Sequence, residues 1–443
     1  MKHTVRRIFV AVILLNGYAG ISQERIEMTL QQAQDYAVKN AFNTKSAVFD
    51  AEAAKYNTAS LKAIGLPQIN GSAQYNQYFY VPYSIIPPGP FGPEATRIRF
   101  VNPYSVTIGA TASQLLFDGT WLVALQAAKS YEQFQSENVK KSAIEVKSYV
   151  ANAYYLSLIS IENSRLIKEA KADMVFTLGQ TKAILEAGFT ESENVDQLQL
   201  AVNDLDIQIT YSDEQAKLTN DLLKFQMGLP LNTELVLTDN LDAFMEASSG
   251  NLLSTVFIPE NNIDVQIANS GLTLQELNLK VKKAAYLPNL SAFINFQTAA
   301  YRQRFDFFDS AQPYLYGNLL GVQMNVPILS GGMRKNEVKK VEVEVKRMEE
   351  TTNLARKASE LEFRAARSEL SNALQSYSST KNSLDLAKSI LNKSQIKFKE
   401  GLGTSFDVTQ RNTQLIQTQG AYIQSMMKVL HATTRLSKAL NQL

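Results

Sequence analysis

Few residues of this 443-residue chain are equipped for covalent or metal chemistry. There is no cysteine, which excludes disulfides and a thiolate nucleophile, and there are two histidines, His3 and His431. A zinc site needs three or four ligands together, so a lone histidine does not make one. Adjacent carboxylates such as Glu349 and Glu350 stand in helical stretches of mixed charge, as on a solvated face. With no glycine-rich phosphate loop and no nucleophile–base set, the sequence predicts a protein that is not an enzyme and that holds no metal or cofactor.

The first residues, 1–22, have the pattern of a secretory signal peptide. Lys2, Arg6 and Arg7 precede the apolar run 8–15, which is too short to span a bilayer, and small residues follow near a cleavage site. We therefore expect an exported protein, from which His3 is removed with the signal. The rest of the chain holds 41 basic and 42 acidic residues, and that balance predicts no binding of nucleic acid.

The remaining sequence repeats one order of landmarks. A Leu-Pro step opens an alternating stretch, a glycine starts a long helical run, and a second glycine breaks that run. These landmarks are Leu66-Pro67, Gly119 and Gly188 in the first half, and Leu287-Pro288, Gly331 and Gly401 in the second. The offsets between the halves are 221, 212 and 213 residues, and a nearly constant offset indicates an internal duplication.

Each half holds two stretches in which polar and apolar side chains alternate over about ten residues, the length of a tilted membrane-spanning strand. The predicted strands cover about 67–80, 103–117, 288–301 and 316–329. A soluble β-sandwich gives the same alternation, but aromatic residues crowd the loop ends of these strands, as in the interfacial girdle of a membrane barrel. The girdle candidates are Tyr75, Tyr78, Tyr80, Tyr104, Tyr301, Phe305 and Tyr316.

Four strands are too few to close a membrane barrel, because the small barrels have at least about eight. Open strand edges in lipid would leave backbone groups without hydrogen-bond partners, at several kcal/mol each. The chain is therefore expected to oligomerise. Two copies would give eight strands around a filled interior, and three would give twelve strands with room for a lumen.

Long helical stretches follow each predicted strand pair. The runs 120–187 and 333–400 contain almost no glycine or proline, so each should form a helix of roughly 100 Å. Shorter helices are expected before the strands and after the glycine turns, at 28–64, about 261–285, 194–227 and 406–440. Two short helices stacked end to end match one long helix, which predicts a helical cylinder with the barrel at one end.

Side chains that repeat every seven residues favour coiled helices, although an ordinary amphipathic bundle has the same period. The series runs from Leu370 through Tyr377, Leu384 and Leu391 to Phe398. We divide the chain into the signal 1–22, a first repeat 23–228, an equatorial segment 229–258 and a second repeat 259–443. The helical hairpins cover about 120–228 and 332–441, with tips near 188 and 401.

After the signal, the whole chain resembles the TolC family of outer-membrane efflux proteins. The residues that carry the resemblance are the two Leu-Pro steps, the strand-to-helix junctions 116–119 and 327–332, and the helical turns 187–195 and 400–408. The resemblance implies a mainly α-helical trimer with a twelve-stranded barrel in the outer membrane, continued through the periplasm by an α-helical barrel. Such a conduit serves tripartite efflux or type I secretion and works with a periplasmic adaptor and an inner-membrane transporter. The alternative is a periplasmic coiled-coil adaptor or scaffold without a pore.

The resemblance also implies roles for the two helical turns. In the family the adaptor docks at these tips, which here are Gly188, Phe189 and Thr190 in the first hairpin and Gly401, Leu402 and Gly403 in the second. The plainer interpretation is that glycine ends each helix in a left-handed conformation.

Acidic residues just after the second turn commonly ring the closed pore in this family, and Asp407 falls in that position. Asn194 stands at the equivalent place of the first turn and Gln410 at the next candidate place, so any gate would carry few charges. The alternative is helix-start chemistry, with Ser405 as the N-cap and Asp407 in the first turn.

Overall fold

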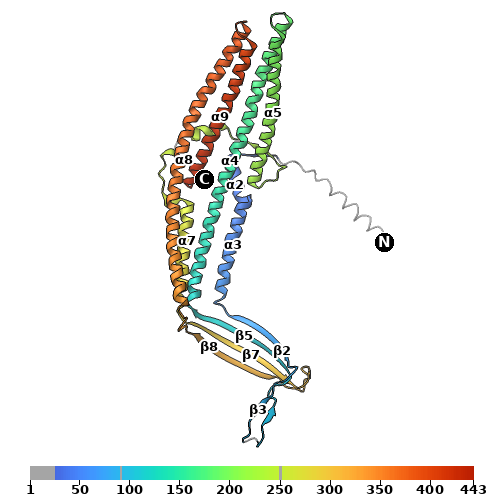
Figure 1. Cartoon of the computed structure of the whole chain (residues 1–443), viewed down its shortest axis with the longest axis vertical. Helices are drawn as coiled ribbons and strands as arrows, with labels where there is room; N and C mark the ends of the chain where they lie inside the picture. Colours follow the sequence, from blue (N-terminus) through green and yellow to red (C-terminus); the bar gives the residue numbers. More distant parts are fainter. Residues whose placement is uncertain (1–24, 90–91, 249–251) are drawn as a thin grey trace, which may run out of the picture. The chain divides into compact units, whose positions relative to one another are not determined.

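Two sets of elements make up the chain, and each is assembled from segments that are distant in sequence. The computed structural model describes residues 25–89, 92–248 and 252–443, so the predicted signal peptide lies outside the described residues. One unit contains residues 50–136 and 267–353. The other contains the residues up to 49 together with 137–266 and 354–443. Figure 1 labels the elements and colours them along the sequence.

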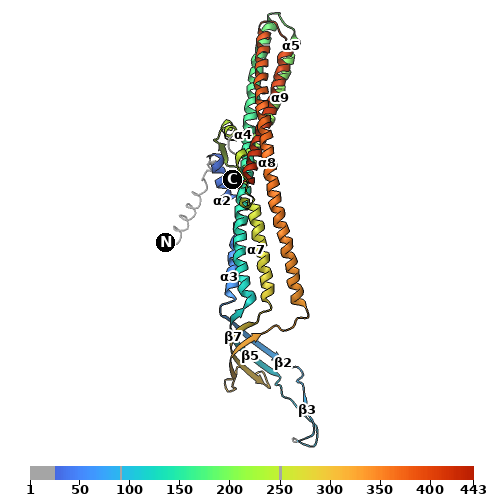
Figure 2. The same cartoon turned by 90° about the vertical axis from the view of Figure 1, so that its left-hand side faces the viewer.

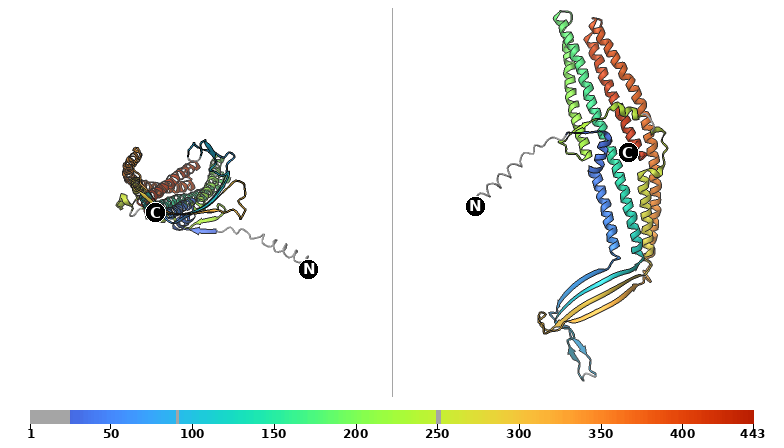
Figure 3. Two further views of the ribbon diagram at one scale, coloured as in Figure 1. Left: turned by 90° about the horizontal axis from the view of Figure 1, so that it is seen from below. Right: turned by 180° about the vertical axis from the view of Figure 1, so that it is seen from behind.

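A four-stranded antiparallel sheet forms the strand portion of the first of these units. Its strands are β2 (Gln68–Gln77), β5 (Tyr104–Asp118), β7 (Asn289–Arg302) and β8 (Leu315–Asn325), paired in the order β2-β5-β7-β8. The four strands lie side by side in the views of Figure 1 and Figure 3. Within the described residues no further strand pairs with the outer edge of β2 or β8. The two predicted strand pairs thus share one sheet.

The register of this sheet separates polar from apolar side chains. Asn70 pairs with Thr111, and Thr111 pairs with Asn295, whose side-chain nitrogen donates to the Thr111 hydroxyl at 2.8 Å. One residue along, Ile69 pairs with Ala112, which pairs with Ile294 of β7. Since cross-strand partners point to the same side of a sheet, one face is mainly polar and the other mainly apolar.

The strand bounds differ from the expected ones at two places. β8 ends at Asn325, about four residues before the expected end, because Pro327 has no N–H for the ladder and Gly331 and Gly332 follow with positive φ of 57° and 86°. The loop between β2 and β5 contains a small hairpin that the sequence did not predict, formed by β3 (Ser84–Ile86) and β4 (Thr96–Ile98).

The helices of this unit flank the sheet in sequence. They are most of α3 (Phe42–Ala63) and α7 (Ile263–Ala284), and the first parts of α4 (Gly119–Glu186) and α8 (Met333–Lys399). At the start of α4 the Asp118 carboxylate accepts hydrogen bonds from the backbone N–H of Thr120 at 2.7 Å and of Trp121 at 3.1 Å. This cap fixes the point at which strand becomes helix. No helix in the described ranges combines the length and the apolar character needed to cross a membrane.

The other unit holds two antiparallel helical hairpins, seen in Figure 1 and Figure 2. One pairs the remainder of α4 with α5 (Ser192–Met227), and the second pairs the remainder of α8 with α9 (Ser405–Ala439). The main hydrophobic core of this unit includes Tyr154, Leu370 and Leu436, all essentially removed from solvent. At about 1.5–3 kcal/mol for each large apolar side chain, this core is a main source of the unit's stability.

The expectation of one continuous helix over 28–64 is wrong. The structure has a short strand β1 (Arg25–Met28), then α2 (Leu30–Asn40) and α3, with Ala41 in an extended conformation between the helices. A segment far along the chain lies against this break. A Cβ on Gly228 would stand 2.8 Å from the Asn40 carbonyl oxygen, so the two segments approach closely where the helix breaks. β1 also pairs in parallel with β6 (Glu234–Leu237).

The segment after α5 was expected to be mixed loop with a short strand. It contains β6, α6 (Leu241–Ser248) and two short 3-10 helices, Leu252–Ser254 and Pro259–Asn261. The Tyr154 hydroxyl bonds both the Met28 carbonyl oxygen at 3.0 Å and the Asp239 carboxylate at 2.9 Å, which ties this segment to β1 and α4.

Candidate functional site

The first hairpin tip is the turn between α4 and α5. Gly188 has φ of +80°, and its amide donates to the Leu185 carbonyl at 2.9 Å while the Phe189 amide donates to Ile184 at 3.1 Å. This is the pattern in which a left-handed glycine closes a helix C-terminus. Phe189 follows with 84% of its surface exposed. An apolar ring held in solvent at a turn is a candidate contact for another protein.

The second hairpin tip, between α8 and α9, is built in the same way. Gly401 has φ of +73°, and the Leu402 amide donates to the Lys397 carbonyl oxygen at 2.8 Å. Leu402 is 79% exposed, at the position equivalent to Phe189. The two tips therefore share a backbone design and an exposed apolar residue, so glycine does end each helix as the plainer interpretation held. Their contact with an adaptor stays a prediction.

α9 begins with a reciprocal capping box formed by Thr404 and Asp407. The Asp407 amide donates to the Thr404 hydroxyl at 3.1 Å, and the Thr404 amide donates to the Asp407 carboxylate at 3.1 Å. The expectation that Ser405 is the N-cap is wrong, because Thr404 occupies that position. The Thr404 hydroxyl and amide lower the pKa of the Asp407 carboxyl, with a further contribution from Arg411 and Lys397. Asp407 is therefore an ionised carboxylate that already has bonding partners.

Asn194 and Ser405 connect the two tips. The buried Ser405 hydroxyl donates to the side-chain oxygen of Asn194, whose side-chain nitrogen donates to the Thr190 hydroxyl at 3.0 Å. Asn194 and Asp407 stand at equivalent positions of the two turns, but Asn194 bonds Ser405, two residues before Asp407. Gln410 is exposed on α9. Their roles as gate residues stay predictions.

A groove runs along one side of the second hairpin, beside Leu402. It has a volume of about 340 Å³ and lies between the last turns of α8 and the first turns of α9. Its lining includes three cations, Lys393, Lys397 and Arg411, and the single carboxylate of Asp407. No local pattern in the sequence singled out these cations. Their spacing of four residues on α8 places both lysines on neighbouring turns, but only the hairpin pairing brings Arg411 beside them.

The aromatic candidates gather at the end of the sheet that lies opposite the helix junctions. Tyr75 near the end of β2 packs edge-on against Phe305 and Phe307, at centroid distances of 6.0 and 6.1 Å. Tyr104 starts β5, Tyr301 ends β7 and Tyr316 starts β8, while Tyr78 and Tyr80 follow β2. Antiparallel pairing therefore brings all seven aromatic residues to the same end of the sheet. Their position at a membrane interface stays a prediction.

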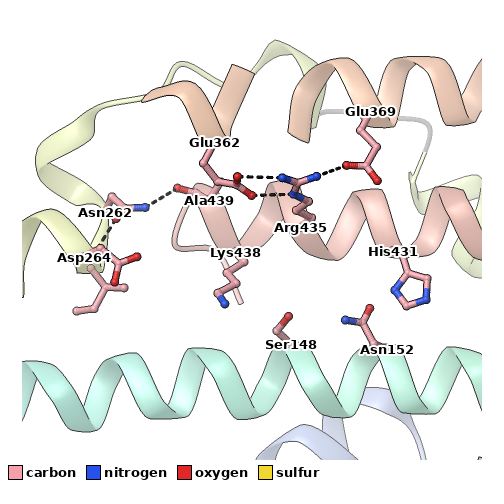
Figure 4. Close-up of a pocket in the computed structure, with 11 residues that line it drawn as sticks. Ser148, Asn152, Asn262, Asp264, Glu362, Glu369, His431, Arg435, Lys438 and Ala439 are labelled. Atoms are coloured by element: carbon pink, nitrogen blue, oxygen red, sulfur yellow. Dashed lines mark hydrogen bonds and ion pairs between the residues drawn. The ribbon is translucent and has the colours of Figure 1, made fainter. Parts of the chain in front are cut away.

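A polar cluster near the other end of α9 surrounds Arg435. Arg435 donates to Glu362 of α8 at 2.7 and 2.9 Å and also to Glu369, and these bonds lower the pKa of the Glu362 carboxyl. Figure 4 shows Ser148 and Asn152 of α4 on the opposite wall of the cavity, which measures about 440 Å³. The paired charges clamp α8 to α9.

His431 lines this same cavity (Figure 4). Within the described ranges, no group of three or more histidine, aspartate or glutamate side chains is arranged to hold a metal ion.

Comparison with known proteins places this geometry in a family context. A model of the outer membrane efflux protein family matches residues 258–442. No curated protein matches the chain. Solved structures with a similar fold include the CusC channel, the outer membrane protein VceC of Vibrio cholerae and the open-state MtrE outer membrane channel of Neisseria gonorrhoeae.

The likeness to these structures extends over nearly the whole chain. CusC is 16% identical with a TM-score of 0.72, and the alignment covers 96% of this chain and 94% of that one. VceC is 16% identical with a TM-score of 0.69 and coverage of 93% and 95%. MtrE is 16% identical with a TM-score of 0.70 and coverage of 93% and 88%. At identities this low the structural likeness shows the fold alone, and it is the fold that the sequence predicted.

Proposed function

We propose that this chain, whose residues 258–442 match the model of the outer membrane efflux protein family, is the outer-membrane channel-tunnel of a tripartite efflux or type I secretion system. Solutes would pass through its lumen, driven by an inner-membrane transporter that connects to it through a periplasmic adaptor. The single observation that carries the proposal is the four-stranded sheet, which has two unpaired edges, one polar face and one apolar face.

The open edges require further copies of the sheet. Within the part of the chain that the structure describes, β2 and β8 each present a row of backbone groups without strand partners, and in lipid each such group costs several kcal/mol. Three copies placed edge to edge pair β8 of one protomer with β2 of the next and give twelve strands. The apolar face then meets outer-membrane lipid, and the polar face lines the interior.

The register defines the chemistry of that interior. Its rows consist of amide and hydroxyl side chains, small residues and a few apolar ones, and no charged residue stands among them. They are Gln68, Asn70, Ser72, Gln74 and Asn76 on β2, Ser105, Thr107, Gly109, Thr111 and Ser113 on β5, and the odd-numbered residues of β7 and β8. A lumen lined in this way hydrates its contents without selecting for charge.

The helical hairpins also present surfaces suited to further copies. Large apolar side chains on the solvent side of α5 recur at intervals of seven and four residues, the spacing of a coiled-coil seam. This α5 stripe consists of Leu200, Ile207, Tyr211, Leu218 and Phe225. On α8, Leu354 and Leu361 are exposed seven residues apart and form a second stripe, the α8 stripe. An exposed stripe of this length favours burial against another helix, here that of a neighbouring protomer.

The alternative that the sequence left open, a periplasmic scaffold without a pore, does not explain the sheet. A periplasmic protein would expose the apolar face of four strands to water, at about 25 cal/mol for each Å². No observation on this chain favours that alternative.

The test is a deletion strain combined with fractionation. Loss of the gene should sensitise cells to compounds in a broad toxicity panel or block export of a secreted polypeptide, and the protein should fractionate with the outer membrane and need detergent for extraction. A protein released by osmotic shock without detergent would contradict the proposal.

A further inference from the structure

The basic groove of the second hairpin has no counterpart in the first. An offset of 213 residues superposes Gly188 on Gly401, and it also superposes two pairs of buried core residues, Leu178 on Leu391 and Val202 on Leu415. Each residue of the second hairpin can therefore be compared with its equivalent in the first. If both tips had the same role, equivalent residues should be of similar type. Differences at equivalent positions then mark what one tip does and the other does not.

At the groove the two hairpins differ in charge. Lys397 stands where the first hairpin has Ile184, and Lys393 stands where it has Gln180. Arg411 stands where the first hairpin has Leu198, which is fully buried in the core of its own hairpin. The first hairpin thus fills this space with its own apolar side chain. The second leaves a groove and places cations around it.

Within the described residues these cations are only partly balanced, because Lys397 and Arg411 act on the single carboxylate of Asp407. Lys393 and Lys397 have no ion pair within the described part of the chain, and Arg411 donates to the neutral side chain of Gln414 at 3.3 Å. The one carboxylate in the groove, that of Asp407, is bonded to Thr404. Three cations against one occupied carboxylate leave a positive field in a concave site.

The position of the groove separates it from the surfaces suited to copies of this chain. On α8, Leu384 and Leu391 pack into the core shared with α9. The exposed residues Leu361 and Ile396, which lie in the register of the α8 stripe, are on the opposite side of the helix. By the same helical spacing, Lys397 lies on the side of α8 between the core-facing side and the α8 stripe. In a wall of helices this side faces inward or outward, where a partner other than the next protomer can reach it.

We propose that this groove docks acidic side chains of the periplasmic adaptor, and that Leu402 beside it supplies the apolar contact. This inference rests on the proposed function, which supplies the adaptor. The groove has a volume of about 340 Å³, which leaves room for individual side chains of a docked protein. An exposed apolar residue beside unpaired charges gives the contact an apolar centre and an orientation.

The opposite charge of the first tip supports two different contacts on one adaptor. Glu191, Glu193 and Asp196 are exposed there. One uniform adaptor surface cannot match both tips by charge. The acidic contact is therefore assigned to the second tip alone.

Carbodiimide cross-linking tests this assignment, because it joins a carboxylate directly to an amine with no spacer. The reagent is applied to membranes of the source organism that contain the full-length chain, and the joined peptides are identified by mass spectrometry. The expected product is an amide from Lys393 or Lys397 to an Asp or Glu of a periplasmic protein whose deletion abolishes the same export. Raising the salt from about 0.05 to 0.5 M should reduce the yield, because screening weakens such a contact.

Matched variants separate the groove from surface charge in general. K393Q/K397Q removes the reacting amines, so its readout is co-purification of the adaptor, which should fall by about tenfold, the size expected for two rim ion pairs. K388Q removes an exposed lysine of the same helix outside the groove and should leave that co-purification unchanged. In K393R/K397R the charge is kept, and co-purification of the adaptor should persist although arginine forms no carbodiimide product.

Three results would overturn the proposal. One is a product from these lysines to Glu191, Glu193 or Asp196 of a second copy. Another is an adaptor product that maps only to other lysines, and the third is no product at these lysines in membranes where the channel is active. If instead the chain is absent from the outer membrane, the proposed function fails before the groove is in question.

Discussion

Replacing Gly65 with alanine should disrupt the junction between the first strand pair and its helices. A Cβ at Gly65 would overlap ring carbon Cζ2 of Trp121 and stand 2.6 Å from Cη2. The ring is held in place because its Nε1–H donates to the Leu61 carbonyl oxygen at 2.8 Å. The backbone at Gly65 does not require glycine by its φ, so the close approach alone sets the cost.

The magnitude follows from two contributions. Forcing a methyl group against a rigid ring costs about 1–3 kcal/mol. Displacing the ring also breaks the hydrogen bond to Leu61, worth about 0.5–1.5 kcal/mol. Together they lower the free energy of unfolding by about 2–4 kcal/mol.

Fluorescence measures this change directly, because Trp121 is the only tryptophan of the chain. In purified Gly65→Ala protein, the emission maximum should shift to longer wavelength and the urea midpoint followed by that emission should fall. Gly317→Ala in β8 is the matched control, since a Cβ there meets no heavy atom within 4 Å. An unchanged emission maximum and midpoint in Gly65→Ala would refute the packing argument.

Five further substitutions test the tips, the assembly and the pore. Gly188→Ala and Gly401→Ala should each lower the free energy of unfolding by about 1 kcal/mol, because the space around them is open and only the positive φ opposes a side chain. Gly179→Ala inside α4 should raise it by about 0.5–1 kcal/mol. Hydrogen exchange at the turns and in α4 measures the two opposite changes. Ile207→Glu, in the middle of the α5 stripe, should shift detergent-purified protein from trimer to monomer in light scattering, and a stable trimer would remove the stripe from the interface. Asp407→Ala should raise conductance and lower cation selectivity in a bilayer, because the carboxylate keeps its charge within the capping box; unchanged values would leave Asp407 a cap residue only.

Local signals in the sequence predicted most of the fold. The strand alternation and the glycines at 188 and 401 depend on neighbours within a few residues, and the structure has strands and turns at those places. The helix start at Thr404 was also readable, because a threonine followed three residues later by an acid is a capping-box spacing. The sequence-based prediction placed the N-cap one residue later, at Ser405.

Other features depend on contacts that no local pattern contains. The break at Ala41 arises where Gly228 approaches Asn40, and β1 forms because β6 lies beside it. The basic groove needs Lys397 and Arg411 to meet across a hairpin. In each case the partners are distant in sequence, and only the fold places them together.

The mass of the detergent-purified complex is the measurement that bears most directly on the central claim, that three chains complete one barrel. Native mass spectrometry should give three chains, with single-channel conductance from the same preparation. A complex of two chains would contradict the account, because eight strands close around side chains and leave no lumen. A monomer would contradict it as well, since four strands cannot satisfy their edges in lipid.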